Sequence, residues 1–296
     1  MTKSPMAWIN GKVQTAENAK VSVFDRGFLF GDGIYETGRS YQKTFVFLEE
    51  HWMRLRSSAE KLGIKITWTN ADLEQGLYEL AQAFGQPDVY FRTIVTRGAI
   101  ESVGIDVFGT QPPTLVHIIQ PISEEKLHKL RQSGIHVLTS HVVRNASDAQ
   151  DPNIKTSNYL NSLLALQDVK RRGADDAILC NRLGQVTEGT TFSVFGVTEE
   201  GKLITPAQGV GILDSITRRH VLEEARRFMA TEEGEFPVET FMNCREAFIA
   251  SSVREIVPIH TWDGKKFTEV PGPVTRDLQA RLRAVIDTYV RSHRKF

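Results

Sequence analysis

The hydrophobic period changes several times along this sequence, and these changes constrain its fold more than any other feature. Five apolar residues recur at steps of four, three, four and three: Leu48, Trp52, Leu55, Ala59 and Leu62. That spacing places them on one face of a helix, and the following Gly63 is a typical helix end. A second stripe of the same kind runs to Phe84, with Asn70 as the expected N-cap. The sequence therefore predicts two amphipathic helices in succession.

Strand-type segments surround these helices. The dipeptide Asn10-Gly11 supplies the positive φ that a tight hairpin turn requires. Residues 21–24 and 34–41 carry β-branched and aromatic residues and are expected to form strands. Residues 89–96 and 114–119 have the apolar character of buried strands. Strands and helices are thus mixed within this part of the chain.

The remainder of the chain continues the mixture. Residues 120–131 are more polar and are interpreted as a connection between domains, although Leu127 and Leu130 also permit a short helix. Further strands and a hairpin turn are expected at these places: 135–143, 176–180, 186–188, 193–197 and the turn 199–201. Further helices are expected over 157–172, after Asp214 and after Pro273.

This order favours an α+β fold with two mixed or antiparallel sheets over a doubly wound parallel sheet. The length of 296 residues suggests about two domains. We expect a small N-terminal domain over 1–119, the connection over 120–131, and a larger domain over 132–296.

Composition excludes several classes of protein. The 36 basic and 36 acidic residues give no net charge, which argues against nucleic acid or an anionic membrane as a partner. No stretch approaches the ~18 apolar residues of a membrane helix. Cys180 and Cys244 are far apart and form neither a disulfide framework nor a thiolate zinc site. We therefore expect a cytoplasmic protein. The eight histidines show no metal-ligand spacing, so we expect no metal.

Three positions could carry chemistry, and each also has an ordinary interpretation. Lys155 lies between a polar stretch and an apolar helix, where it is either a solvated loop residue or a Schiff-base lysine. Glu188 ends an apolar strand and either faces a cleft or is a plain turn residue. Ser215 begins a helix, so that it is either a simple N-cap or part of a phosphate site.

In chain order, these segments resemble the motifs of the class IV aminotransferases, the fold type IV pyridoxal-phosphate enzymes. The matching segments are 25–36 (DRGFLFGDGIYE), 50–59 (EHWMRLRSSA), 155–162 (KTSNYLNS), 186–189 (VTEG), 212–218 (ILDSITR) and 251–252 (SS). The likeness runs from Trp8 to about Leu282 and implies a small α/β N-terminal domain and a larger β-barrel-like C-terminal domain that binds the cofactor. It also implies a pocket between the domains, completed by a second subunit, and hence a homodimer or a larger homo-oligomer.

The resemblance implies a role for each matching residue. Lys155 forms the Schiff base with pyridoxal 5′-phosphate and shuttles the proton, and Glu188 keeps the pyridine nitrogen protonated. Arg54 clamps the phosphate. Tyr159 hydrogen-bonds the ring oxygen O3′. The remaining phosphate ligands come from two turns: Ser215, Ile216, Thr217, Ser251 and Ser252.

The substrates implied are an amino acid and a 2-oxo acid. Tyr90 and Arg92 resemble the Tyr-x-Arg of branched-chain aminotransferases, which helps to hold the substrate carboxylate, and Arg39 falls where that subfamily has an arginine. The other substrate positions implied are Tyr35, Arg97 and Val253. We therefore favour an L-branched-chain amino acid: 2-oxoglutarate transaminase. Arg97 or Arg39 would then receive the second carboxylate of glutamate.

Three alternatives remain. Residues 25–33 and Thr96-Arg97-Gly98 look more like the D-amino acid aminotransferases, but the Arg-x-His carboxylate trap of those enzymes is missing at 99–103. Thr37 also departs from the glycine usual in branched-chain enzymes. An aminodeoxychorismate lyase would use the same lysine, although residues 158–160 speak against it. A catalytically idle binding protein with this fold is the last alternative, and the intact Lys155 argues against that.

Overall fold

The computed structural model describes residues 3–101, 104–105 and 111–296. These divide into two compact units. The first unit comprises Met1–Ile122, Ile154–Asn158 and Thr288–Phe296, and the second comprises Ser123–Asn153 and Tyr159–Asp287. The chain thus leaves the first unit at Ile122 and returns to it twice.

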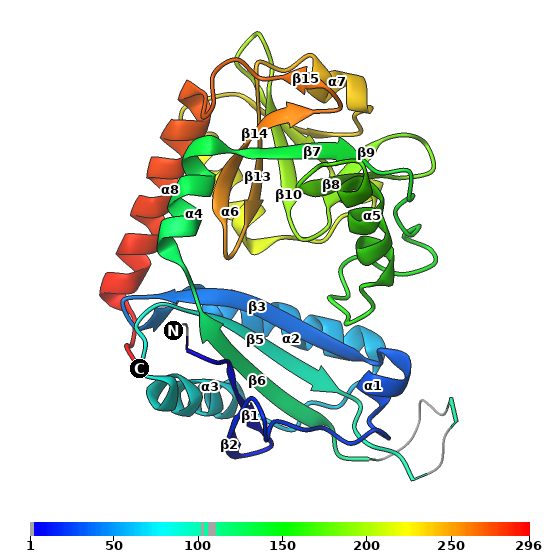
Figure 1. Cartoon of the computed structure of the whole chain (residues 1–296), viewed down its shortest axis with the longest axis vertical. Coiled ribbons are helices and arrows are strands. Elements are labelled where there is room, and N and C mark those ends of the chain that lie inside the picture. Colours follow the sequence, from blue (N-terminus) through cyan, green and yellow to red (C-terminus); the bar gives the residue numbers. More distant parts are fainter. Residues whose placement is uncertain (1–2, 102–103, 106–110) are drawn as a thin grey trace. The chain divides into compact units, whose positions relative to one another are not determined.

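The first unit is built on an antiparallel sheet (Figure 1). Among the described residues it has six strands in the order β2-β1-β6-β5-β3-β4, and each pairing is antiparallel. Its strands are β1 (Met6–Ile9), β2 (Lys12–Thr15), β3 (Gly33–Tyr41), β4 (Thr44–Phe45), β5 (Val89–Thr96) and β6 (Thr114–Pro121). Its helices are α1 (Arg26–Phe30), α2 (Leu48–Leu62) and α3 (Asn70–Phe84).

Local sequence signals account for most of these elements. Asn10 and Gly11 have φ of 44° and 95°, which confirms the predicted hairpin turn between β1 and β2. The helix ending at Gly63 is confirmed as α2. The second helix is confirmed as α3, but its N-cap is Thr69 rather than Asn70, because Thr69 and Asp72 form a capping box.

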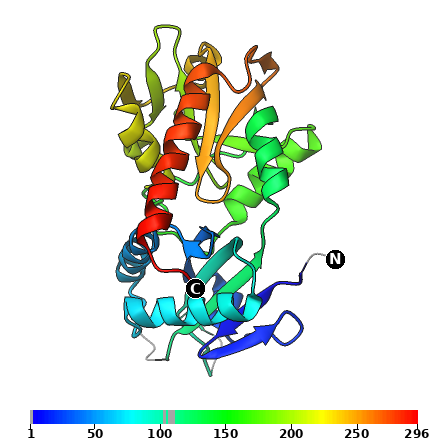
Figure 2. The same cartoon turned by 90° about the vertical axis from the view of Figure 1, so that its left-hand side faces the viewer.

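Helices α2 and α3 cover one face of this sheet (Figures 1 and 2). Their apolar stripes pack with strand residues in a single core, which includes Trp52, Leu55, Leu73, Leu77, Ile34, Phe91 and Ile119. Because side chains alternate along a strand, the odd-numbered residues of β3 and the even-numbered residues of β5 lie on the other face. That second face carries the polar and aromatic residues of interest below.

One prediction for this unit is wrong. Residues 21–24 form no strand; Ser22 organises a turn in which its Oγ accepts from Phe24 N–H and its carbonyl from Asp25 N–H. In the segment 120–131, the helix that Leu127 and Leu130 permit is present: β6 ends at Pro121 and α4 (Glu124–Ser133) follows, capped by Ser123. Ser102 and Val103, part of the segment without the carboxylate trap, lie outside the described residues.

The second unit is built on a mixed sheet. Its main path through the described residues is β12-β11-β10-β13-β14-β7-β8-β9, and β15 pairs with β14. Parallel pairings join β11 to β12, β14 to β7 and β7 to β8. The sheet is curled, because β9 at its end also contacts β10 and β11. Both the expected α+β class and the barrel-like second sheet are confirmed.

The strands of the second unit are β7 (Ile135–Thr139), β8 (Asp176–Cys180), β9 (Val186–Gly189), β10 (Ser193–Val197), β11 (Leu203–Pro206), β12 (Thr231–Gly234), β13 (Glu246–Ser251), β14 (Glu255–Trp262) and β15 (Lys265–Lys266). Its helices besides α4 are α5 (Leu160–Arg171), η1 (Gln208–Val210), α6 (Ile216–Ala225), α7 (Val238–Met242) and α8 (Pro273–Ser292), the last of which ends in the first unit. Aromatic residues, including Phe241 and Trp262, fill the core of the curled sheet. Within the part of the chain described, no helix is long and apolar enough to cross a membrane.

Candidate active site

The segment that carries Lys155 is fixed to the first unit. Tyr35 N–H of β3 donates to the Lys155 carbonyl at 2.9 Å, and Ser157 N–H donates to the Gly33 carbonyl at 2.9 Å. On the other side, Lys155 N–H donates to Ser58 Oγ of α2 at 3.1 Å. The backbone of Lys155 is therefore held by a strand and a helix, which is not the setting of a mobile loop lysine.

The side chain of Lys155 lies over an aromatic ring. Its Nζ is 4.5 Å from the centroid of the Tyr35 ring, and the Arg92 Cζ is 3.9 Å from the same centroid. Tyr35 is buried, on the sheet face opposite α2 and α3. The Lys155 amine and the Arg92 guanidinium thus both lie beside the Tyr35 ring. The π-electrons of the ring attract both cations.

Two further predicted substrate residues share this sheet face. Arg39 and Tyr90 are direct cross-strand partners in β3 and β5. Arg39 is buried, with its Cζ 4.0 Å from the centroid of the Tyr41 ring. The Nε atoms of Arg39 and Arg92 are buried and make no hydrogen bond.

Arg54 belongs to a buried polar cluster on the opposite face of β3. Its Nε and one terminal nitrogen donate to the two oxygens of Glu36, each at 2.7 Å. His51 Nδ1 lies 2.7 Å from Glu36 Oε2. Glu36 therefore orients the guanidinium that the resemblance assigns to the phosphate.

Charges within this cluster shift the pKa values of its members. Burial would raise the pKa of Glu36, but the charge and hydrogen bonds of Arg54, with the hydrogen bond from His51, lower it to about 2. Burial lowers the pKa of His51, against the hydrogen bond and charge of Glu36, and the charges of Arg54 and Lys155 lower it further. A carboxylate, a guanidinium and a neutral imidazole result at neutral pH.

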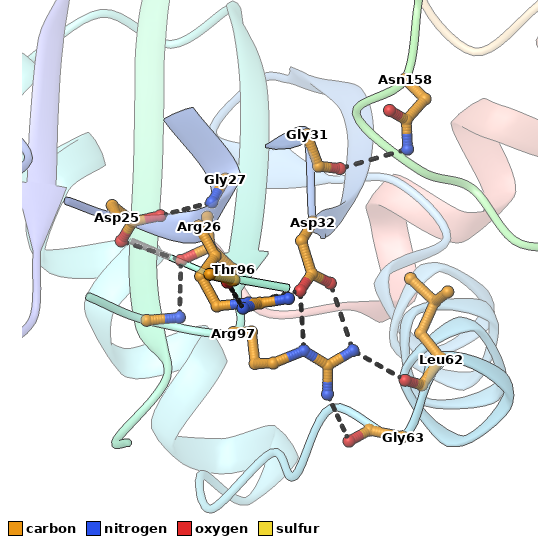
Figure 3. Close-up of polar contacts among 12 residues, drawn as sticks. Asp25, Arg26, Gly27, Gly31, Asp32, Leu62, Gly63, Thr96, Arg97 and Asn158 are labelled. Carbon is orange, nitrogen blue, oxygen red and sulfur yellow. Dashed lines mark hydrogen bonds and ion pairs between the residues drawn. The ribbon is translucent and has the colours of Figure 1, made fainter. Parts of the chain in front are cut away.

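Arg97, predicted to contact substrate, is engaged elsewhere in the first unit (Figure 3). Its Nε and one terminal nitrogen donate to the Asp32 carboxylate at 2.8 and 3.2 Å. It also donates to the carbonyls of Leu62 and Gly63, both at 2.9 Å. Arg26 binds the same carboxylate at 2.8 Å. We therefore propose a structural role for Arg97 in place of the predicted substrate contact.

The glycine-rich segment of the first motif has a packing role. Gly31 ends α1 with φ of 66°, a left-handed conformation that favours glycine. A Cβ on Gly31 would lie 2.5 Å from Asn158 Oδ1, and Asn158 Nδ2 donates to the Gly31 carbonyl at 3.2 Å (Figure 3). Only glycine permits this close approach, which secures the segment that follows Lys155.

In the second unit, Glu188 of β9 is buried and bound on both oxygens. Arg144 donates to Oε1 at 2.5 Å and Leu213 N–H donates to Oε2 at 3.2 Å. Sequence reasoning missed Arg144, because it lies 44 residues from Glu188 in a segment without a motif. Its guanidinium supplies a counter-charge that stabilises the Glu188 carboxylate in a buried position.

The two predicted phosphate turns of the second unit meet. Ser215 caps α6, and its Oγ accepts from Arg218 N–H. The Thr217 Oγ1 and Ser252 Oγ atoms lie 3.4 Å apart. The first N–H groups of α6, those of Ile216 and Thr217, have no partner within the helix. Hydroxyls beside the positive end of a helix are suited to a phosphate.

Three other predicted residues belong to the second unit: Tyr159, Ser251 and Val253. Tyr159 precedes α5, where its carbonyl accepts from Leu163 N–H at 2.9 Å. Ser251 ends β13, and its Oγ accepts from Arg254 N–H at 3.4 Å. Val253 is half-buried in the turn after Ser252. In the described residues, no group of three or more metal-ligating side chains comes together.

Comparisons with known proteins identify the family. Residues 33–262 match the family described as amino-transferase class IV. A relative from Methanocaldococcus jannaschii, provisionally named a branched-chain-amino-acid aminotransferase, is 34% identical over 94% of this chain and 95% of its own. The D-alanine aminotransferase of Bacillus licheniformis is 31% identical over 93% of this chain and 94% of its own. The PLP-form structure of a branched-chain amino acid aminotransferase from Thermobaculum terrenum has a TM-score of 0.86 and 28% identity, and the match covers 97% of this chain and 96% of that one.

The chain belongs to the class IV aminotransferases, which use pyridoxal 5′-phosphate. It is an aminotransferase of fold type IV. The residues present fit this cofactor: a held primary amine at Lys155, a buried carboxylate at Glu188, and hydroxyls at the start of α6. The resemblance first seen in the motifs is thereby confirmed.

Proposed function

We propose that this protein transfers the amino group of L-leucine, L-isoleucine and L-valine to 2-oxoglutarate, giving branched-chain 2-oxo acids and glutamate. One observation carries the proposal: Lys155 Nζ and Arg92 Cζ both lie beside the buried ring of Tyr35, at 4.5 and 3.9 Å from its centroid. A reactive amine and a carboxylate-binding guanidinium beside one ring suit the amino and carboxylate ends of an amino acid.

Each predicted cofactor residue has its own role in this proposal. When bound, pyridoxal phosphate supplies a ring that withdraws electrons from the substrate α-carbon. Lys155 holds it and moves the proton at that carbon. Glu188, supported by Arg144, places a negative charge at the pyridine nitrogen, and Tyr159 binds the ring oxygen O3′. Arg54, Ile216, Thr217 and Ser252 bind the phosphate.

Most of the proposed substrate contacts come from residues of the first unit. Arg92 and Tyr90 bind its carboxylate, in keeping with the buried Nε of Arg92 that makes no hydrogen bond. Arg39, with a second such Nε, receives the other carboxylate of 2-oxoglutarate or glutamate. Tyr35 and Val253 contact the side chain. The substrate pocket thus accepts an aliphatic side chain in one half-reaction and the second carboxylate of glutamate or 2-oxoglutarate in the other.

A second candidate is D-amino acid transamination, with D-alanine as donor. The 31% identity to a D-alanine aminotransferase favours it. Both candidates use the same lysine, so that the orientation of the substrate between Arg92 and Arg39 decides which face of the α-carbon meets Lys155.

We further propose a homodimer or larger homo-oligomer in the cytoplasm. The segment around α1 exposes five large apolar side chains: Val21 47%, Val23 61%, Phe24 49%, Phe28 69% and Phe30 37%. Apolar side chains gathered in this way are typical of an interface. Both cysteines are free thiols, as expected for a reducing compartment.

The test compares amino donors with 2-oxoglutarate as acceptor. We expect glutamate formation from L-Leu, L-Ile and L-Val and little from D-Ala; turnover of D-Ala alone would establish the second candidate. Pyruvate release from aminodeoxychorismate would identify a lyase instead. Lys155→Ala should abolish every one of these activities. Mass spectrometry of borohydride-reduced protein should place the cofactor adduct on Lys155, and an adduct elsewhere would contradict the assignment.

A further inference from the structure

The turn that carries Ser252 has an unusual residue at its end. Ser251 and Glu255 are Cα partners at the ends of β13 and β14, so that three residues form the hairpin loop between them. Glu255 has φ of 60°, in the left-handed region. Three-residue hairpin loops need such a conformation at the position after the turn, and glycine usually supplies it. A glutamate there is held by its surroundings.

A buried ion cluster holds Glu255. Its Oε1 accepts from Arg131 of α4 at 3.0 Å and from Arg283 of α8 at 2.7 Å. The side chains of Glu255 and Arg131 are only 6% and 9% exposed. Arg131 also binds Glu124, which anchors α4 to the same cluster. The carboxylate of Glu255 therefore fixes one end of the turn to two helices.

The neighbouring residues complete this attachment. Gln279 of α8 donates through Nε2 to the carbonyl of Ile256, directly after Glu255, at 3.0 Å. Arg254, directly before it, reaches Asp176 at 3.1 Å and Thr191 Oγ1 at 2.9 Å. Arg254 thus attaches the turn to Asp176 and Thr191, and Glu255 attaches it to α4 and α8. These two attachments determine the position of Ser252.

We propose that Glu255 is a positioning residue for the phosphate site: it holds the turn so that the Ser252 hydroxyl stays beside Thr217. The proposal rests on the proposed binding of the cofactor phosphate by Thr217 and Ser252. Glu255 binds Arg131 and Arg283, so that it acts on the phosphate site through the backbone of the turn. Its effect is therefore selective for ligands that carry a phosphate.

The test compares two ligands in the full-length apoprotein. Pyridoxal phosphate and pyridoxal both react with Lys155, but only the first uses the phosphate turns. In Glu255→Gln the side chain keeps its shape and loses its charge. We expect this variant to bind pyridoxal phosphate about tenfold more weakly, the effect of one misplaced charge-assisted hydrogen bond, and to bind pyridoxal as the wild type does. Spectrophotometric titration gives both affinities.

Glu246→Gln is the matched control, because Glu246 is equally buried in β13 but caps the start of α8 instead of the turn. It should lower stability without changing the ratio of the two affinities. Arg283→Gln, at a half-exposed side chain, removes one partner of Glu255 and serves if Glu255→Gln does not fold; about a threefold loss of phosphate preference is expected. An unchanged ratio in a folded variant would overturn the inference alone, whereas a wild type that binds both ligands equally would overturn the phosphate assignment with it.

Discussion

Arg92 and Arg97 show how one residue type at neighbouring positions acquires different surroundings. Both were expected at the substrate. Arg92 lies over the Tyr35 ring with a buried Nε that makes no hydrogen bond, whereas Arg97 binds Asp32 twice and two backbone carbonyls. Arg97 is held by two carbonyls and by a carboxylate that it shares with Arg26, which supports the structural role proposed for it in the first unit.

Substitution separates these two roles. Arg97→Met leaves Asp32 with Arg26 as its remaining ion-pair partner and should lower the free energy of unfolding by about 3 kcal/mol. KM for the amino donor should stay within about twofold of the wild-type value. Arg92→Met should instead lower kcat/KM about 100-fold, since a carboxylate loses a charged partner worth roughly 2–3 kcal/mol.

Urea denaturation and steady-state kinetics on the same preparations provide the measurements. The two variants serve as controls for each other, because Arg92→Met removes a guanidinium from β5 and Arg97→Met removes one from the residue directly after that strand. A large rise in KM with intact stability for Arg97→Met would restore that residue to the substrate site.

At the scale of elements, the sequence predicts the turns and helices that interactions between neighbouring residues determine. The turn at Asn10-Gly11 and the stripe of α2 are local, and both are found where expected. The cap of α3 shifted by one residue, because Thr69 can share a reciprocal pair of hydrogen bonds with Asp72. Residues 21–24 have strand-type composition, but no neighbouring strand in the described sheet pairs with them. A strand needs a partner, and composition does not reveal one.

A buried histidine on β6 gives the first unit a pH dependence of stability. Burial lowers the pKa of His117 from 6.5 to about 3, and its Nδ1 lies 2.8 Å from Thr93 Oγ1. Between these pH values the unfolded chain binds a proton that the folded protein does not bind. The stability that His117 contributes is therefore complete above pH 6.5 and is lost as the pH falls toward 3.

We expect His117→Phe to flatten this dependence. Between pH 6.5 and 5 the wild type should lose about 2 kcal/mol more free energy of unfolding than the variant, at about 1.4 kcal/mol per pH unit for one proton. His51, whose pKa is also lowered, adds a similar slope in both proteins and cancels in the difference. The exposed His128 provides the control, since His128→Gln should leave the slope unchanged. Equal slopes for the wild type and His117→Phe would contradict the burial argument.

At the scale of the molecule, the motifs predicted the family better than they predicted the organisation. Each motif is a short run of consecutive residues that can be identified without knowledge of the three-dimensional structure. That Ile154–Asn158 belongs to the first unit, bonded to Ser58 and Gly33, depends on contacts across about 100 residues or more of chain, which no local pattern encodes. Arg144 beside Glu188 was missed for the same reason.

Assembly is the last property at this scale, and the exposed segment around α1 offers its test. Phe28 is 69% exposed and Phe24 49%, so that neither is needed for packing within the first unit. If this segment forms the contact between subunits, Phe24→Glu with Phe28→Glu places two charges in an apolar interface, where burial of each costs several kcal/mol. Light scattering after gel filtration should then show a dimer or larger species for the wild type and a monomer for the double variant, with unchanged circular dichroism.

Leu183→Glu, at an 80% exposed residue of the second unit, is the matched control and should leave the mass unchanged. Because the resemblance makes the second subunit complete the pocket, the monomer should also lose turnover. A double variant that stays at the wild-type mass would exclude this segment as the interface.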